Sequence, residues 1–291
     1  LRYGIPEYRL PKAVLDKEIA LIEDMGVKIL CNTRIGKDVS FEQLQKENDA
    51  VIIAIGAWTS MKVGCAGEEL NGVYGGIDFL RSIALGAPAH IGEKVVIMGG
   101  GNTAMDACRS AIRLGAKEVT VVYRRTEKEM PAEKIEIAEA KEEGVTFRFL
   151  ANPCELIGEN GTLKQVKLQV MELGEPDAGG RRSPVPVEGK FDYIEADSFI
   201  EAIGQKVSVS GFEGVELNRK GIICADEHSF RTNIEGVFAV GDATNKGADI
   251  AIAAIGEANK AALIVDAYLN GLDIPYRKPF VSERKVENID F

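Results

Sequence analysis

The chain has 291 residues, of which 45% are hydrophobic and 27% are charged, and its net charge is −10. A length near two average domains and an ordinary globular composition predict two folded units. An acidic surface repels phosphate backbones, so we do not expect nucleic acid as a partner.

Cysteine spacing and hydropathy exclude several further classes of protein. The five cysteines are scattered without a Cys-x-x-Cys pair, so we expect reduced thiols and neither a redox dithiol nor a metal or iron–sulfur site. The most apolar stretch, Ile250 to Leu269, is interrupted by Glu257, Lys260 and Asp266, so no membrane span is expected. These features predict a soluble, cytoplasmic protein.

The first part of the chain alternates predicted helices and strands. The apolar spacing predicts a helix over residues 12–25 and, capped by Ser40, another over 40–46. Short apolar runs predict strands over 27–30 and 49–55. Because the chain begins without methionine and without a preceding strand, we expect it to be cut from a longer one.

A second unit is expected to begin after residue 90. Predicted strands cover 94–98, 118–123 and 145–150; predicted helices cover 102–114 and 131–143, the latter with Pro131 in its first position. Two antiparallel strands are predicted over 163–173 and 191–203, joined by a polar loop over 174–183. A strand over 236–240 and a helix over 249–269 close the chain. Alternating strands and helices predict an α/β fold with parallel sheets.

A glycine-rich turn follows the strand over 94–98. Gly99, Gly101 and Ala104 have the G-x-G-x-x-A spacing, and Asn102 and Thr103 open the helix after it. The first glycine allows a tight turn, the second lets the backbone approach a pyrophosphate, and the small alanine permits close packing of helix on strand. Free N–H groups at the helix start favour an anion. The complete strand–turn–helix frame predicts a dinucleotide site.

The residues after the next strand indicate which nucleotide is bound. A site for NAD places Asp or Glu there, but this chain has Arg124 and Arg125. Two guanidinium groups suit the 2′-phosphate of NADP, which a carboxylate would repel. The alternative is a solvated charged turn, since Glu127, Lys128 and Glu129 follow.

Three more strand ends carry candidate binding residues. The runs over 49–55 and 199–203 each end in Ala-Ile-Gly, at Gly56 and Gly204, where a small residue leaves room for a nucleotide. The strand predicted over 236–240 is followed by Gly241 and Asp242. They therefore lie at its carboxyl end, where ligands bind open α/β sheets. Each run alone is also compatible with an ordinary core strand.

Together these segments resemble the pyridine-nucleotide–disulfide oxidoreductase superfamily of two-dinucleotide flavoproteins. The resemblance is closest to the NADPH-oxidising small (beta) subunits of bacterial glutamate synthase, with related subunits in ferredoxin–NADP oxidoreductases. The matching stretches lie in every part of the chain: residues 1–11, 99–106, 123–125 with 130–131, and 241–257.

The resemblance implies two Rossmann-like domains and hydride transfer from NADPH to FAD. Asp242 would accept a hydrogen bond from FAD, and the helix start formed by Ala248, Asp249, Ile250 and Ala251 would face the flavin. The segment from Tyr3 to Pro11 would approach the flavin ring. Such a transfer needs stacking and exclusion of water, so no catalytic acid or base is expected.

The resemblance also implies what this chain lacks. Members of the family carry a first G-x-G-x-x-G strand–turn–helix, which holds the adenosine half of FAD, and no such motif is found ahead of the glycine turn in this sequence. The expected organisation is therefore an incomplete, discontinuous FAD domain over 1–90 and 206–291, with an NADP(H) domain over 91–205 inserted in it. FAD binding would need the missing N-terminal segment, and uncovered apolar faces would favour self-association.

Several functions stay open on the sequence alone. The first is an electron-input enzyme whose partner is a large amidotransferase-type or ferredoxin-linked subunit. The second is a non-catalytic NADP(H)-binding or docking fragment. A plain NADPH dehydrogenase finds no support, because no Ser-Tyr-Lys or His-Asp arrangement is present.

Overall fold

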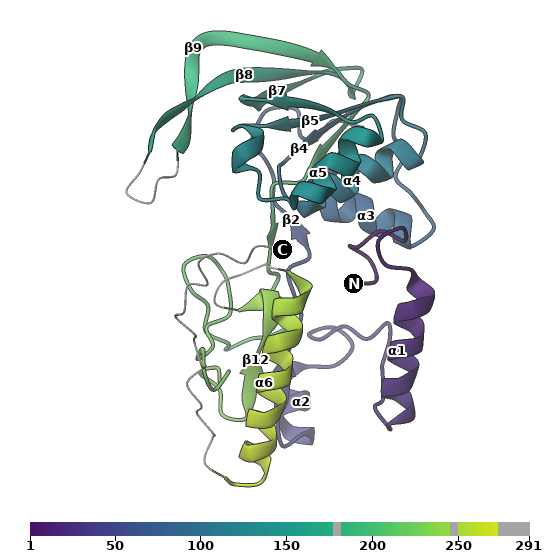
Figure 1. Ribbon diagram of the computed structural model, residues 1–291. Coiled ribbons are helices and arrows are strands. Elements are labelled where there is room, and N and C mark those ends of the chain that lie inside the picture. Colours follow the sequence, from purple (N-terminus) through teal and green to yellow (C-terminus); the bar gives the residue numbers. More distant parts are fainter. Residues whose placement is uncertain (177–181, 245–249, 273–291) are drawn as a thin grey trace, which may run out of the picture. The chain divides into compact units, whose positions relative to one another are not determined.

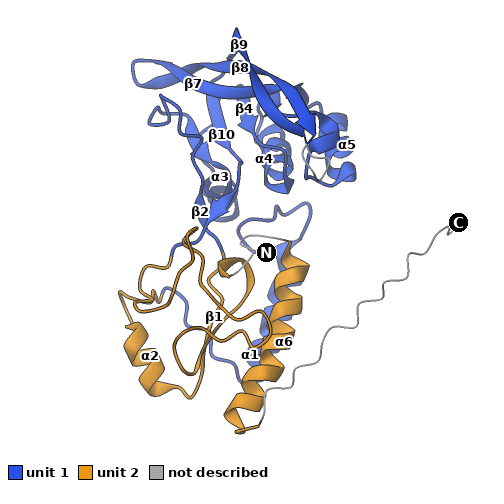
Figure 2. Ribbon diagram, turned by 90° about the vertical axis from the view of Figure 1, so that its left-hand side faces the viewer, with its two compact units in different colours: residues 1–32, 57–208 blue, residues 33–56, 209–291 orange. Residues whose placement is uncertain are grey.

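The computed structural model describes residues 1–176, 182–244 and 250–272 (Figure 1). The chain forms two compact units, coloured separately in Figure 2. Unit 1 comprises residues 1–32 and 57–208, and unit 2 comprises residues 33–56 and 209–291. Each unit is therefore assembled from two separated stretches of chain.

A five-stranded parallel sheet forms the centre of unit 1, in the order β3-β10-β4-β5-β6. Its strands are β3 (Val73–Gly75), β4 (Lys94–Met98), β5 (Glu118–Tyr123), β6 (Thr146–Phe149) and β10 (Ser198–Glu201). The chain runs outward from β4 through β5 to β6, whereas β10 pairs with the other side of β4. The order thus reverses at β4, and the carboxyl ends of strands at such a reversal form a crevice that binds ligands.

Helices cover one face of this sheet and an antiparallel sheet covers the other (Figure 1). The helices are α3 (Gly76–Ala84), α4 (Asn102–Arg113) and α5 (Lys134–Glu142); the antiparallel strands are β7 (Ala151–Glu159), β8 (Thr162–Pro176) and β9 (Arg182–Glu195). The two-residue alternation of a strand explains this arrangement. Val95 and Ile97 pack among the helices, while Val96 and Met98 pack toward the antiparallel strands.

Smaller elements complete unit 1. Helix α1 (Lys12–Asp24) has no buried residue, and a short 3-10 turn, η1 (Glu127–Glu129), follows β5. Strands β2 (Thr59–Ser60) and β11 (Gln205–Lys206) form an antiparallel pair.

Unit 2 is built on two parallel strands, β1 (Val51–Ile53) and β12 (Val237–Ala239). Helix α6 (Ala251–Leu269) packs on them, placing Ile264 and Val265 in one core cluster with Phe238 and Val240. The short helix α2 (Phe41–Glu47) begins with a buried phenylalanine, and η2 (Gly241–Ala243) follows β12 directly. None of the helices in the described ranges combines the length and the apolar character that a membrane crossing requires.

The first turn of α2 supplies a small test of local stability. Ser40 Oγ accepts a hydrogen bond of 3.0 Å from the backbone N–H of Gln43, which satisfies one of the open donors of the helix. Ser40→Ala should lower the free energy of unfolding by about 1 kcal/mol. Ser40→Asp, which retains an acceptor, should restore it in urea titrations; an equal loss in both variants would contradict the cap.

The structure corrects three predicted elements. Residues 27–30 are not a strand, because no described strand pairs with them and Val27, Ile29 and Leu30 remain exposed. Helix α5 begins at Lys134 instead of Pro131, with Glu133 as its cap. The run expected over 191–203 is two strands: β9 ends in the antiparallel sheet, and the chain crosses at residues 196–197 to form β10 in the parallel sheet.

The unit boundaries also differ from those expected. Residues 57–90 and 1–32, placed in the outer domain by sequence, pack with the glycine-turn unit. The reason is strand pairing, since β3 hydrogen-bonds to β10 and α3 contributes Phe79 and Leu80 to the helical core. Of the polar loop predicted over 174–183, residues 174–176 belong to β8 and residues 182–183 to β9. Residues 177–181 lie outside the described part.

Candidate dinucleotide-binding site

The glycine turn lies at the carboxyl end of β4, where the strand order reverses. Gly99 adopts φ +149°, and a Cβ there would lie 2.2 Å from the carbonyl oxygen of Ala202. A Cβ on Gly100 would lie 2.6 Å from the ring of Tyr123. The protein itself therefore requires glycine at both positions, because only glycine fits against this neighbouring backbone and ring.

Gly101 differs from its two neighbours. Its φ of −97° is open to any residue, and the nearest atom to an added Cβ is Pro131 Cγ at 3.9 Å. No side chain caps α4, and within the described residues no acceptor is found for the N–H groups of Asn102 and Thr103. Open space beside a helix start with free donors fits a pyrophosphate. Ala104 is fully buried, as close packing of α4 on the sheet requires.

A loop after η1 forms one wall of the turn. The backbone N–H of Ala132 donates to the carbonyl oxygen of Gly100 at 3.0 Å, and that of Glu133 donates to Asn102 Oδ1 at 3.2 Å. Tyr123 Oη donates to the carbonyl oxygen of Glu129, which holds its ring against the turn. No sequence motif indicates this wall, because its hydrogen bonds to the turn join residues far apart in the chain, 31 residues in the case of Glu133 and Asn102.

The two arginines after β5 have different environments. Arg124 is exposed at the carboxyl end of the strand beside β4, on the side of the sheet edge that carries the glycine turn. Arg125 is only 7% exposed, and its Nε donates to the carbonyl oxygen of Arg182 at 3.2 Å. Arg124 is thus available to a ligand, whereas Arg125 also holds β9.

Gly204 joins the same edge of the sheet in unit 1. The backbone N–H of Ala202 donates to the carbonyl oxygen of Met98, directly before the glycine turn, and Gly204 follows with φ +128°. Its carbonyl oxygen accepts from the N–H of Met61. The structure therefore brings Gly204 and the glycine turn to neighbouring strand ends.

In unit 2, the strand ends bring Gly56 and Asp242 to one edge. They follow the carboxyl ends of β1 and β12, which are paired in parallel, and Gly56 takes φ +64°. Gly241 takes φ +71°, and its N–H donates to Glu257 Oε2 on α6 at 2.8 Å. Ile250 caps α6 and Ala251 begins it, with no side-chain cap. Ala248 and Asp249 lie outside the described residues.

These unit 2 residues are compatible with one end of a flavin. A carboxylate beside a strand end can accept a hydrogen bond from a ligand hydroxyl, and a long helix offers a positive dipole end. Gly56 provides a position without a side chain, Asp242 a carboxylate, and α6 the amino end of a long helix.

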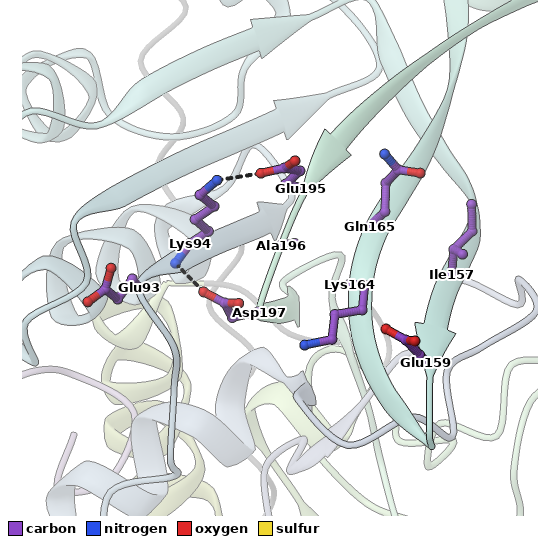
Figure 3. A pocket seen from close by; sticks show the side chains of 9 residues that line it. All are labelled: Glu93, Lys94, Ile157, Glu159, Lys164, Gln165, Glu195, Ala196 and Asp197. Atoms are coloured by element: carbon purple, nitrogen blue, oxygen red, sulfur yellow. Dashed lines mark hydrogen bonds and ion pairs between the residues drawn. The ribbon is translucent and has the colours of Figure 1, made fainter.

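A cavity of about 690 Å³ lies elsewhere in unit 1 (Figure 3). It is lined by charged residues around the start of β4 and the end of β9, including Lys94, Glu195 and Asp197. Lys94 pairs with Glu195 through Nζ and with Asp197 through its backbone N–H. The cavity therefore lies at the amino end of β4, opposite the glycine turn. Ligands bind open α/β sheets at the carboxyl ends of the strands, so this cavity is not the expected dinucleotide site.

Asp106, in the second turn of α4, is a buried carboxylate close to the site. Arg9 Nη1 donates to both of its oxygens at 2.9 Å. Burial raises the pKa of Asp106 to about 6, against the opposing effect of Arg9, while Glu136 raises it and Arg109 lowers it. Tyr8 lies beside the same helix, and burial raises the pKa of its phenol.

The raised pKa of Asp106 predicts a pH dependence of stability. The folded chain binds this proton more tightly than the unfolded chain, so its contribution to stability is complete below about pH 4 and is lost as pH rises through about 6. In urea titrations, the free energy of unfolding of Asp106→Asn should rise relative to that of wild type by up to about 3 kcal/mol as the pH increases over this range. A difference in stability between Asp106→Asn and wild type that stays constant from pH 4 to pH 7 would contradict the raised pKa.

Two of the cysteines, the half-buried Cys65 and the buried Cys108, have thiols of raised pKa. Burial raises the pKa of the Cys65 thiol to about 11 and that of Cys108 to about 12. No group of three or more His, Cys, Asp or Glu residues in the described ranges is arranged to hold a metal ion. We expect both thiols to resist alkylation at pH 8 in the native chain and to react in guanidinium, measured by mass spectrometry.

The parallel sheet, the strand-order reversal and the glycine turn define an α/β dinucleotide-binding protein. The family model of pyridine nucleotide-disulphide oxidoreductases matches residues 10–258, and the chain belongs to this family. The fold places it with proteins of two Rossmann-like domains: the structure titled Mycobacterium tuberculosis FprA in complex with NADPH has a TM-score of 0.77 at 18% identity, covering 93% of this chain and 75% of that one.

Two curated relatives cover most of this chain. The NADP(+)-dependent formate dehydrogenase subunit beta of Moorella thermoacetica is 44% identical over 273 residues, which is 92% of this chain and 38% of that protein. The glutamate synthase [NADPH] small chain of Halomonas elongata is 40% identical over 286 residues, which is 93% of this chain and 60% of that protein. The chain thus spans about half the length of these relatives. The family resemblance inferred from the sequence is confirmed.

Proposed function

We propose that this chain binds NADPH at the glycine turn of unit 1 and passes its hydride to FAD, as the electron-input module of an NADPH-oxidising flavoprotein. One observation carries the proposal: an open helix start at Gly101 and an exposed Arg124 lie at the carboxyl ends of adjacent strands. The turn suits a pyrophosphate and the guanidinium suits a 2′-phosphate. Both curated relatives are named for NADP(H), which supports the choice of nucleotide.

The residues of this chain would act by binding and orientation. The N–H groups of Asn102 and Thr103 would bind the pyrophosphate, Arg124 would bind the 2′-phosphate, and Gly204 would leave room at the neighbouring strand end. Arg125 would hold the start of β9 from its buried position beside Arg124. No side chain is needed as an acid or base, because hydride transfer requires alignment and exclusion of water.

In unit 2, Gly56, Gly241, Asp242, Ile250 and Ala251 would contribute to the flavin site. Ala248 and Asp249, expected from the sequence to belong to the same site, lie outside the described residues. FAD, when bound, supplies the acceptor for the hydride. The dipole of α6 would favour negative charge at its amino end.

The electrons would leave to a partner subunit. The relatives are named as a subunit and a small chain, which supports a multi-subunit assembly. We propose a large amidotransferase-type or ferredoxin-linked subunit as the acceptor. Purification from the native source would show which large protein accompanies this chain.

The proposed activity can be tested in two stages. Calorimetry should show that NADP⁺ binds the chain more tightly than NAD⁺. Under anaerobic conditions, NADPH should then bleach the absorbance of FAD added to the full-length protein, and NADH should do so more slowly. Binding of NADP⁺ without bleaching would contradict hydride transfer and leave a non-catalytic binding module.

A further inference from the structure

The segment of residues 3–10, which we call the docked segment, lies along α4 in unit 1. Near its end, Arg9 Nη1 donates to both carboxylate oxygens of Asp106 at 2.9 Å, and Nη2 lies 3.1 Å from Glu136 Oε1 on α5. The side chains of Asp106 and Glu136 are only 6% and 11% exposed. One guanidinium therefore bridges two buried carboxylates on two helices.

A second contact holds the same segment farther along α4. The centroid of the Tyr8 ring lies 3.8 Å from the guanidinium carbon of Arg113 and 4.8 Å from that of Arg109. Arg109 in turn pairs with Glu136, Glu139 and Glu143 of α5 and its C-cap. A cavity of about 280 Å³ lies beside these contacts, between the segment, α3 and α4.

Of the two bridged helices, α4 begins at the glycine turn and α5 begins after the loop that packs against this turn. Asp106 lies four residues after Asn102, a rise of about 6 Å along the helix. Glu136 lies in the first turn of α5, which follows the loop that hydrogen-bonds to Gly100 and Asn102. Arg9 consequently fixes the separation of the two helix starts that flank the pyrophosphate position.

We propose that Arg9 is a positioning residue that couples docking of residues 3–10 to coenzyme binding. By bridging α4 and α5, Arg9 preorganises the turn and its wall, and a bound coenzyme fixes the same two helix starts and so tightens the docking of the segment. The coupling must be reciprocal, since the two events are linked thermodynamically. This inference rests on the proposed NADPH site.

The test uses NADP⁺, which binds without hydride transfer, and two readouts on the whole chain. The first is the Kd of NADP⁺ by calorimetry, and the second is the rate of tryptic cleavage after Lys12, with and without NADP⁺. In wild type, NADP⁺ should slow this cleavage. Arg9→Met should raise the Kd about tenfold and remove the protection. Arg9→Lys keeps the positive charge but not the bidentate guanidinium, so its Kd and its protection should lie between those of wild type and Arg9→Met.

Asp106→Asn distinguishes positioning through Arg9 from a direct effect of the Asp106 charge on the coenzyme phosphates. The variant should fold, because the substitution removes a buried charge. Positioning predicts weaker NADP⁺ binding and lost protection; tighter binding, as expected from removing a negative charge near the phosphates, would overturn the proposal. Glu195→Gln is the matched control, because it removes an exposed ion pair with Lys94 at the opposite end of β4 and should change neither readout.

The outcomes distinguish this inference from the proposed function. If wild type binds NADP⁺ but the Arg9 and Asp106 variants retain its affinity and protection, the coupling is wrong and the site stands. If Arg9→Met accelerates cleavage equally with and without NADP⁺ and leaves the Kd unchanged, Arg9 is only a structural contact, which also overturns the proposal. If wild type does not bind NADP⁺, both proposals fail.

Discussion

Gly101→Ala is expected to leave the chain folded and to weaken NADP⁺ binding by at least about a hundredfold. A Cβ at this position meets only Pro131 Cγ at 3.9 Å, and φ is −97°. Alanine caps a helix less well than glycine, which destabilises the folded chain, but it also restricts the unfolded chain, which stabilises the fold. The two effects on the free energy of unfolding should cancel to within about 1 kcal/mol. The methyl group would instead occupy the space beside the helix start and displace two charge-assisted hydrogen bonds to the pyrophosphate, each typically worth about 1.5–3 kcal/mol.

Gly99→Ala is the matched comparison and should behave in the opposite way. Its Cβ would lie 2.2 Å from a backbone carbonyl oxygen at φ +149°, so overpacking and backbone strain together should cost about 4 kcal/mol of stability. Thermal unfolding and NADP⁺ titration of both variants provide the measurement. If Gly101→Ala retained wild-type affinity, the pyrophosphate would not bind at this turn.

Arg124→Gln should weaken NADP⁺ binding by about ten- to a hundredfold while leaving NAD⁺ binding unchanged. The side chain is exposed at the end of β5, and it would lose a charge-assisted bond to the 2′-phosphate, which NAD⁺ lacks. Stability should change by less than about 0.5 kcal/mol because the side chain makes no buried contact. Calorimetry with both nucleotides checks the difference.

Arg125→Gln separates ligand binding from the contact between Arg125 and the start of β9. Because this side chain is buried and donates to the carbonyl oxygen of Arg182, its loss should lower the free energy of unfolding by about 1–3 kcal/mol in addition to any effect on NADP⁺. Equal losses of NADP⁺ and NAD⁺ affinity in the Arg124 variant would reject the assignment of the 2′-phosphate.

The sequence alone predicts the glycine turn and its neighbouring elements well. Residues 94–104 form β4, the turn and the start of α4 as expected, and β5 ends at Tyr123 just before the two arginines. These features are local, since turn sterics, helix capping and strand alternation act between residues close in sequence. The amino-acid sequence by itself therefore determined the fold class, the family and the position of the candidate dinucleotide site.

The tertiary structure decided which residues surround that site. Arg9 and Asp106 are 97 residues apart, and Arg125 is 57 residues from Arg182, so no periodicity or motif connects either pair. The same is true of β3, which joins the parallel sheet through β10, and of the break between β9 and β10. Such contacts depend on how distant segments bury one another's surfaces, which is a property of the whole packed unit and not of any window of sequence.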